Sequence, residues 1–195
     1  RSGLETDVTH ADEECLQMLV WNPEGEEIAG GYRMIEGERW PMKADGQPDL
    51  ATSHLFSFSE EFLRDYKDST LEVARSYVTT GYQRNAPRNK SIYIMDNLWD
   101  GIGAFLVSHP EIKYLFGKVT ISAGFNHRAM EMMLFFLKKY FQAKKPLIAP
   151  HVPIKKSVPE SEFEALFDGL GFEDGYRVLK REIKALGERI PPMIN

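Results

Sequence analysis

Apolar positions near the start of the chain have the spacing of strands. Cys15 to Trp21 and Glu27 to Ile35 are two such runs, and Asn22-Pro23-Glu24-Gly25 between them has the proline and glycine that a tight reversal needs. Together they predict a β-hairpin. Two later runs, Thr70 to Val78 and Tyr114 to Ser122, are further predicted strands.

Helical spacing of apolar residues marks the rest of the chain. The strongest predicted helix ends near Ser108, before His109-Pro110, and the second covers about residues 129–140. Two shorter helices are predicted over 160–170, with Gly171 as C-terminal cap, and over 176–186, ending at Gly187. Ser59 is expected to cap a short helix that runs to Asp65. Loops are predicted over 36–58 and 79–90.

This order of elements predicts an α/β (α+β) fold, a sheet with helices packed against it. With 195 residues, 43% of them hydrophobic, the chain can bury one core, so residues 1–195 are expected to form a single domain. Its C-terminal part, 155–195, is expected to be helical. The abrupt start at Arg1 and the ending IPPMIN indicate that pieces are missing at both ends.

The composition argues against several kinds of function and binding site. A net charge of −5, from 24 basic and 29 acidic residues, argues against a nucleic-acid binder. The one cysteine, Cys15, allows no intramolecular disulfide and favours the cytoplasm; in its apolar run it is predicted to be a buried structural thiol. No run approaches a membrane span, which leaves peripheral contact with the inner membrane open. The histidines show no metal-ligand spacing, so no metal site is predicted.

Candidate chemistry centres on LEVARSYV, residues 71–78. In a regular strand, Glu72 and Arg75 would point to opposite faces. A bulge between them would put both on one side and splay this strand from its neighbour, which would leave a slot for an extended ligand arm. An ordinary ion pair at a sheet edge is an equally good interpretation of the same residues.

Basic residues suggest where an anion could bind. Arg33 lies in the apolar run GYRMI, where burial requires a partner, and taken alone a solvent-facing side chain is favoured. Arg84, Arg88 and Lys90 lie in a loop that enters the strongest helix, and a helix N-terminus with basic residues can hold a phosphate. The plainer interpretation is a solvated loop. The helix that contains MEMMLFF is predicted to be core rather than a lipid groove.

Four runs together resemble a known family: LEVARSYVTTGYQ, LWDGIGAFL, YLFGKVTIS and the tail ERIPPMIN. They are similar to the GNAT-like N-acyltransferases that depend on acyl-carrier protein. These include the ornithine-lipid N-acyltransferases and the N-acylglycine synthases of Bacteroidetes, some of them labelled hemolysins. The resemblance covers residues 14–122 and 188–195. The family is distantly similar to acyl-homoserine lactone synthases, which share the arginine of GYRMI and the E-x-x-R strand.

The resemblance implies a GNAT fold, a mixed central sheet with splayed strands flanked by helices. It implies an acyltransferase that moves a (3-hydroxy) fatty acyl group to the amino group of an amino acid, of glycine or ornithine type, in aminolipid synthesis. The donor would be acyl-phosphopantetheine on acyl-carrier protein or CoA, with no permanently bound cofactor. Ala86 stands where CoA-binding loops have their first glycine, which favours the carrier protein.

The resemblance also implies roles for individual residues. Glu72 would be the general base, Arg75 would hold Glu72 or the donor arm, and Arg33 would bind the acceptor carboxylate or the donor phosphate. The remaining candidates are backbone amides that polarise the thioester and basic side chains that dock an acidic carrier protein: Ser76, Tyr77, Val78, Arg84, Arg88 and Lys90, with Lys113 and Lys118 as further docking candidates.

Three other functions fit parts of the sequence. A GNAT enzyme could use acetyl-CoA or another acyl-CoA on a polyamine, peptide or aminoglycoside. A non-enzymatic, membrane-associated hemolysin-like protein would require a hydrophobic span or a cationic amphipathic helix, and the sequence shows neither. A binding-only GNAT fold would not need the Glu72 and Arg75 spacing.

Overall fold

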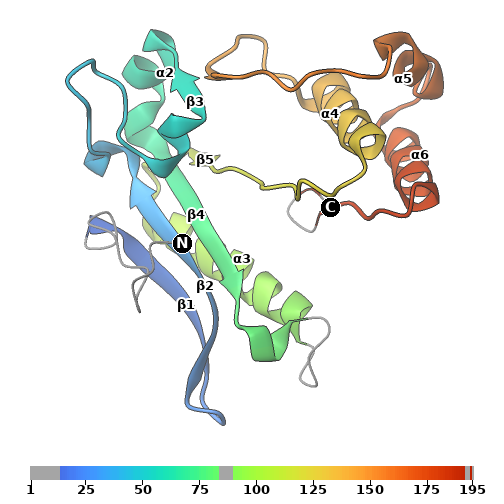
Figure 1. Ribbon diagram of the computed structural model, residues 1–195. Helices are drawn as coiled ribbons and strands as arrows, with labels where there is room; N and C mark the ends of the chain where they lie inside the picture. Colours follow the sequence, from blue (N-terminus) through green and yellow to red (C-terminus); the bar gives the residue numbers. More distant parts are fainter. Residues whose placement is uncertain (1–13, 84–89, 192–193, 195) are drawn as a thin grey trace. The chain divides into compact units, whose positions relative to one another are not determined.

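The computed structural model describes residues 14–83, 90–191 and 194 (Figure 1). Contacts divide the chain into two compact units, Arg1–Lys118 and Val119–Asn195, and each is described by itself. The expected single domain over 1–195 stays a prediction. Within the described residues, every helix is too short or too polar to traverse a lipid bilayer.

A four-stranded mixed sheet forms the centre of the first unit. Its strands lie in the order β1 (Leu16–Asn22), β2 (Glu27–Glu36), β4 (Thr70–Val78) and β5 (Tyr114–Phe116). The first three are antiparallel and β5 is parallel to β4. The predicted hairpin is confirmed, because Asn22 pairs with Glu27 across the turn.

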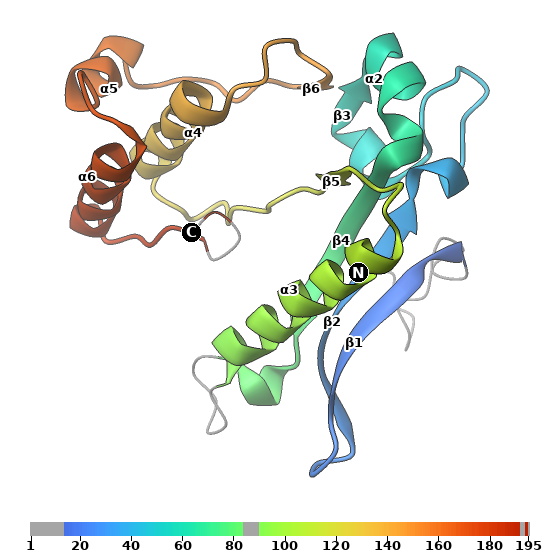
Figure 2. The ribbon, with the colours of Figure 1, turned by 180° about the vertical axis from the view of Figure 1, so that it is seen from behind.

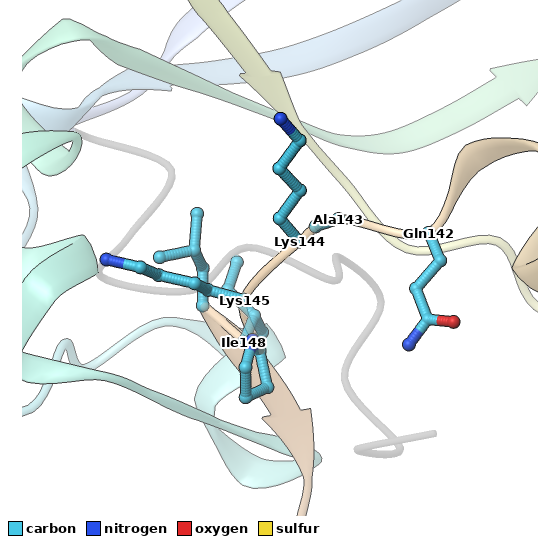
Figure 3. Close-up of a pocket in the computed structure, with 7 residues that line it drawn as sticks. Gln142, Ala143, Lys144, Lys145 and Ile148 are labelled. Carbon is cyan, nitrogen blue, oxygen red and sulfur yellow. The ribbon is translucent and has the colours of Figure 1, made fainter.

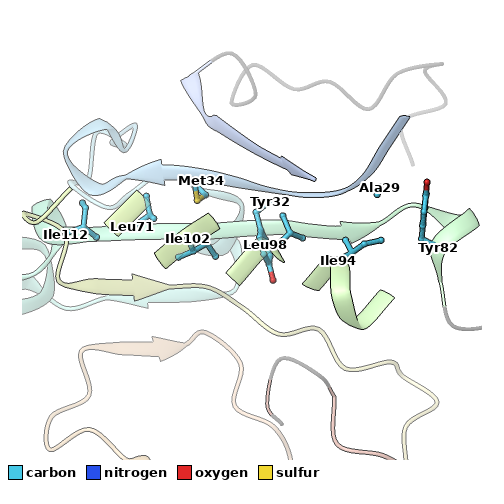
Figure 4. Close-up of a cluster of buried hydrophobic side chains, with 9 residues drawn as sticks. All are labelled: Ala29, Tyr32, Met34, Leu71, Tyr82, Ile94, Leu98, Ile102 and Ile112. Atoms are coloured by element: carbon cyan, nitrogen blue, oxygen red, sulfur yellow. The ribbon is translucent and has the colours of Figure 1, made fainter. Parts of the chain in front are cut away.

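One long helix, α3 (Ser91–Ser108), covers one face of this sheet (Figure 2). Its Ile94, Leu98 and Ile102 are at most 4% exposed and pack against side chains of β2 and β4 (Figure 4). Burial of each such side chain stabilises the unit by roughly 1.5–3 kcal/mol. The helical spacing seen in the sequence is therefore confirmed, and the helix ends at Ser108 as predicted. The other buried members of this core are Ala29, Tyr32, Met34, Leu71, Tyr82 and Ile112.

A β-bulge interrupts the pairing of β2 with β4. Arg33 pairs with Ala74, but Gly31 pairs with Tyr77, so two residues of β4 stand opposite Tyr32. Arg75, the first of the two, has a φ of 49°, in the left-handed region that non-glycine residues rarely adopt. The bulge inferred from the sequence is present, but it lies after Ala74 rather than between Glu72 and Arg75.

Short elements interrupt the segment that was expected to be a loop. Within 36–58 they are η1 (Gly37–Arg39), η2 (Ala51–His54) and β3 (Phe56–Phe58). The predicted short helix α2 (Glu60–Asp65) follows, then η3 (Lys67–Ser69) and, later in the chain, η4 (Thr80–Tyr82). The predicted cap of α2 is confirmed, since the Ser59 hydroxyl accepts a 3.1 Å hydrogen bond from the Phe62 N–H. The loop predicted over 36–58 is present at residues 40–50 but not at η1, η2 and β3. Aromatic rings from this segment pack against rings from elsewhere in the unit. We call Trp40, Phe58, Phe62 and Phe116 the aromatic cluster; their ring centroids lie 5.4–6.2 Å apart.

Gly37 lies where two segments touch. A Cβ added there would stand 1.6 Å from the carbonyl oxygen of Lys67, and the Lys67 ammonium donates a 3.0 Å hydrogen bond to the Gly37 carbonyl. We expect Gly37→Ala to destabilise the protein by about 2–3 kcal/mol, because backbone rather than a flexible side chain must move. Urea unfolding measures the loss. Gly81→Ala, where an added Cβ meets nothing within 4 Å, is the control and should change stability by about 0.5 kcal/mol or less.

The second unit is mainly helical. It contains α4 (His127–Phe141), β6 (Ile148–Pro150), α5 (Glu160–Leu166) and α6 (Phe172–Ala185). Met132, Met133 and Phe136 of α4 are at most 2% exposed, so the prediction that the Met-rich helix is core is confirmed. The other buried members of this core are Ala129, Phe163, Phe167, Leu179 and Ile183.

Several predicted boundaries are wrong. The helix expected over 160–170 ends at Leu166, and the helix expected over 176–186 begins at Phe172. The strand expected over Tyr114 to Ser122 ends at Phe116; a Cβ on Gly117 would lie 2.7 Å from the Val73 carbonyl oxygen, and residues 117–120 are exposed. Gly171, expected to cap a helix C-terminus, is instead the N-cap of α6, with a φ of −73°. The left-handed glycine after α5 is Gly169, whose φ is 65°.

A buried carboxylate, Glu131, ties α4 to the segment before α5. Its Oε1 accepts from the Ser157 N–H (2.7 Å) and hydroxyl (2.6 Å), and its Oε2 accepts from the Val158 N–H (2.9 Å). Burial raises the pKa of Glu131, but these donors and nearby His127 outweigh it and lower that pKa to about 2. The charged form of Glu131 is thus part of the packing of this unit.

Candidate functional site

Glu72 is buried in the first unit, and its carboxylate accepts a hydrogen bond from a side chain of another element. It is 3% exposed, and along the sheet it pairs with Ile35 of β2 and Phe116 of β5. The hydroxyl of Thr52, itself 1% exposed in η2, donates a 2.6 Å hydrogen bond to Glu72 Oε1. The sequence analysis did not name Thr52. No pattern signalled it, because twenty residues separate Thr52 from Glu72 and only folding brings them together.

The surroundings of Glu72 shift its pKa upward. Burial is the largest influence and raises the pKa, while the hydrogen bond from Thr52 and the positive charges of Arg33 and Lys118 lower it. Phe116, its partner on β5, belongs to the aromatic cluster, which surrounds this end of the sheet with apolar rings. A carboxylate whose pKa is raised is a stronger base than an ordinary glutamate.

Arg33 is buried rather than solvent-facing. It is 6% exposed, so the orientation favoured for it from sequence alone is wrong. The physical reason is the register of the two strands. Arg33 pairs with Ala74 and Ile35 pairs with Glu72, which makes Arg33 and Glu72 diagonal neighbours on the same face of the sheet. The positive charge of Arg33 at this position favours the ionised form of Glu72 and lowers its pKa.

The bulge places the other β4 candidates in a different environment from Glu72. Arg75 and Ser76 are exposed, Tyr77 is 45% exposed, and Val78 packs partly against the core beneath α3. The side-chain amide of Gln83 donates a 2.9 Å hydrogen bond to the Val78 carbonyl, which holds the end of β4 against the start of the following loop.

The basic loop is described only at its edges. Lys90 is exposed and is the N-cap residue of α3, and its N–H bonds the Tyr82 carbonyl at 3.3 Å. Arg84 and Arg88 lie outside the described residues, so their proposed part in anion binding or docking stays a prediction. Lys113 and Lys118, the further docking candidates, are exposed.

β4 and β5 pair over only three positions. Thr70, Leu71 and Glu72 face Tyr114, Leu115 and Phe116, and β4 then continues for six residues to Val78. Glu72 is therefore the last residue of β4 in this parallel register. The predicted splay of β4 from its neighbour would begin at this position, which brings the candidate base to the point where pairing stops.

Two features of the second unit could also suggest a site. A hollow lined by residues 142–148 contains Lys144 and Lys145, whose side chains extend in different directions (Figure 3). Ser157, His127 and Glu131 lie together, but the Ser157 hydroxyl (3.1 Å) and the Glu131 carboxylate (2.7 Å) both contact His127 Nδ1. A nucleophilic triad needs a different ring nitrogen for each partner, so this cluster does not activate Ser157.

Known proteins match this chain in two ways. Residues 2–89 match the family described as acetyltransferase (GNAT) domain. A glycine N(alpha)-acyltransferase of Bacteroides thetaiotaomicron is 41% identical over 197 residues, which cover 100% of this chain and 58% of that protein. A glycine N(alpha)-acyltransferase of Phocaeicola vulgatus is 42% identical over 179 residues, which cover 92% of this chain and 55% of that protein.

The chain thus spans somewhat more than half the length of these two curated relatives. No solved structure is significantly similar to it. The antiparallel strands β1, β2 and β4 lie within the family match over residues 2–89, and the helix α3 and the parallel strand β5 follow it and complete the mixed sheet with its covering helix. The expected fold class, a mixed α/β protein of GNAT type, is confirmed.

Proposed function

We propose that this protein is an N-acyltransferase that moves a fatty acyl group from a phosphopantetheine thioester to the amino group of glycine. The observation that carries the proposal is Glu72, a buried carboxylate with a raised pKa at the last paired position of β4 and β5. The family match and the names of the two relatives support the reaction class and the acceptor.

The chemistry requires a base. The amine of an amino acid is largely protonated at pH 7, and only the neutral amine attacks. In the proposed step, the glycine nitrogen forms a bond to the thioester carbonyl carbon and the carbon–sulfur bond breaks. Glu72, directly or through a water, takes the proton that the nitrogen loses, and the departing thiolate is protonated to a thiol.

Binding groups for the two substrates surround this base. Arg33, buried beside Glu72, is suited to the carboxylate of glycine, because a guanidinium binds a carboxylate with two parallel hydrogen bonds. The backbone of β4 beyond Glu72, around Ser76, Tyr77 and Val78, would lie along the donor arm and polarise the thioester carbonyl. Arg75, at the bulge, is proposed to contact that arm.

The donor is proposed to be an acyl-carrier protein rather than CoA, and the product an aminolipid precursor. Ala86 in place of a loop glycine supports this choice, and the basic residues Arg84, Arg88 and Lys90 suit an acidic carrier protein. Exposed basic side chains at such a docking surface would act mainly on the association rate, so the reaction should slow as ionic strength rises.

A purified-enzyme assay tests the proposal. The protein is incubated with glycine and either palmitoyl-carrier protein or palmitoyl-CoA, and N-acylglycine is quantified by mass spectrometry. We expect product with glycine and the carrier protein, and much less with CoA. Equal rates with both donors would overturn the carrier-protein assignment, and transfer to other amines with none to glycine would overturn the acceptor.

A further inference from the structure

Thr52 is held in place by its backbone, which leaves its side chain available for another purpose. The Leu55 N–H bonds the Thr52 carbonyl at 2.9 Å, and the neighbouring Ser53 N–H bonds the Leu50 carbonyl at 3.0 Å. The Ser53 hydroxyl accepts from the Leu50 N–H at 3.3 Å and closes this short turn. None of these bonds uses the Thr52 hydroxyl.

The hydroxyl of Thr52 is aimed at one oxygen of Glu72. Its only proton is donated to Oε1 at 2.6 Å, in a place where Thr52 is 1% and Glu72 3% exposed. A β-branched side chain has few rotamers, so the position of this donor is well defined. An ionised acceptor makes such a hydrogen bond stronger than one between neutral groups. Fixing Oε1 also fixes the direction of the other carboxylate oxygen.

We propose that Thr52 is a positioning residue for proton transfer, which holds the Glu72 carboxylate by Oε1 so that its other oxygen faces the acceptor amine. This inference rests on the proposed function, because it takes Glu72 to be the base. It adds a residue from η2, outside the strands β2 and β4 that carry Arg33 and Glu72, to the reaction site.

The hydrogen bond from Thr52 also offsets part of the effect that burial has on the pKa of Glu72. The pKa of Glu72 is raised by burial, and the hydrogen bond from Thr52 is the largest of the influences that lower it. Without that donor the pKa should rise further, and a smaller fraction of Glu72 would be ionised at neutral pH. The acidic limb of the rate profile would therefore move to higher pH.

The test compares three variants. Thr52→Val removes the donor with little change of shape, Thr52→Ser keeps a hydroxyl, and Thr70→Val is the matched control. Thr70 is also 1% exposed and lies two residues from Glu72, but its hydroxyl donates to the Tyr66 carbonyl at 2.8 Å. We expect Thr52→Val to lower kcat about 10- to 100-fold with KM for glycine nearly unchanged. The acidic limb of the pH–rate profile of Thr52→Val should shift to higher pH, and Thr52→Ser should recover most of the rate.

An activity-independent measurement separates this inference from the proposed function. The Glu72 carboxyl is titrated by NMR in protein with labelled glutamate, with its signal assigned from Glu72→Gln. An upward shift in Thr52→Val but not in Thr70→Val supports the inference even if glycine proves not to be the acceptor. Equal titration and equal pH profiles in Thr52→Val and Thr70→Val would overturn it, whatever the reaction.

Discussion

Replacing Glu72 by glutamine is expected to lower turnover about 10²- to 10⁴-fold in the glycine acylation assay, because the amide cannot accept the proton of the attacking amine. The protein should stay folded, since glutamine has nearly the same shape and can still accept the hydrogen bond from Thr52. Circular dichroism and urea unfolding check the fold. Glu38→Gln, an exposed position of η1, is the control and should leave turnover unchanged.

The same variant has a predicted effect on stability. The folded-state pKa of Glu72 lies above its unfolded value, so the ionised side chain opposes folding. As pH rises from below 4.5 through the raised pKa, the wild-type protein loses stability that the neutral glutamine keeps. At neutral pH, Glu72→Gln should therefore be as stable as the wild type or more so. If Glu72→Gln lost stability relative to the wild type between pH 4 and pH 7, this prediction would be contradicted.

Replacing Glu131 by glutamine should have the largest effect on stability. Both carboxylate oxygens accept backbone N–H groups, and an amide would turn its NH₂ toward one of them. A buried donor left unpaired costs about 1–3 kcal/mol, and the loss of charge weakens the remaining bonds, so we expect a loss of about 3 kcal/mol. Urea unfolding of the protein measures it, with turnover per folded molecule as a second readout.

The ionised Glu131 stabilises the protein, whereas the ionised Glu72 opposes folding, so their contributions to stability change with pH in opposite directions. The pKa of Glu131 is lowered from 4.5 to about 2, so its stabilising contribution is complete above the unfolded value and disappears as pH falls toward 2. The gap between wild type and Glu131→Gln should shrink over that interval. Glu162→Gln, which breaks an exposed 2.8 Å ion pair with Arg128, is the control and should cost about 1 kcal/mol or less. A similar loss in both variants would refute the structural role of Glu131.

Local patterns predicted the longer strands and helices. The hairpin of β1 and β2 and the helix α3 were recognisable because their apolar residues repeat at fixed spacing over many positions. The segment from Gly37 to Phe58 was not, since its short elements depend on rings that meet from distant parts of the chain, Trp40 with Phe116 for example. The end of β5 at Phe116 could not be recognised from local patterns either.

The candidate site was predictable in its residue types but not in its geometry. Arg33 could be named because a charged residue in an apolar strand is unusual, and Glu72 because of its spacing to Arg75. The resemblance gave them roles. Their burial depends on the register between β2 and β4, which the sequence of neither strand specifies alone. Thr52 could not be named, since a threonine in a turn is ordinary until the fold brings it to Glu72.

Because the backbone of Arg75 is left-handed, selection for stability and selection for activity should favour different residues at this position. A non-glycine residue at a φ of 49° costs roughly 1–2 kcal/mol, which glycine or asparagine would largely avoid. Selection for stability alone in a mutant library should therefore favour Arg75→Gly, whereas selection for acyl transfer should favour arginine. Given the role proposed for Arg75, a thermostability campaign scored without an activity assay would drift toward a better-folded but impaired protein, starting at this bulge.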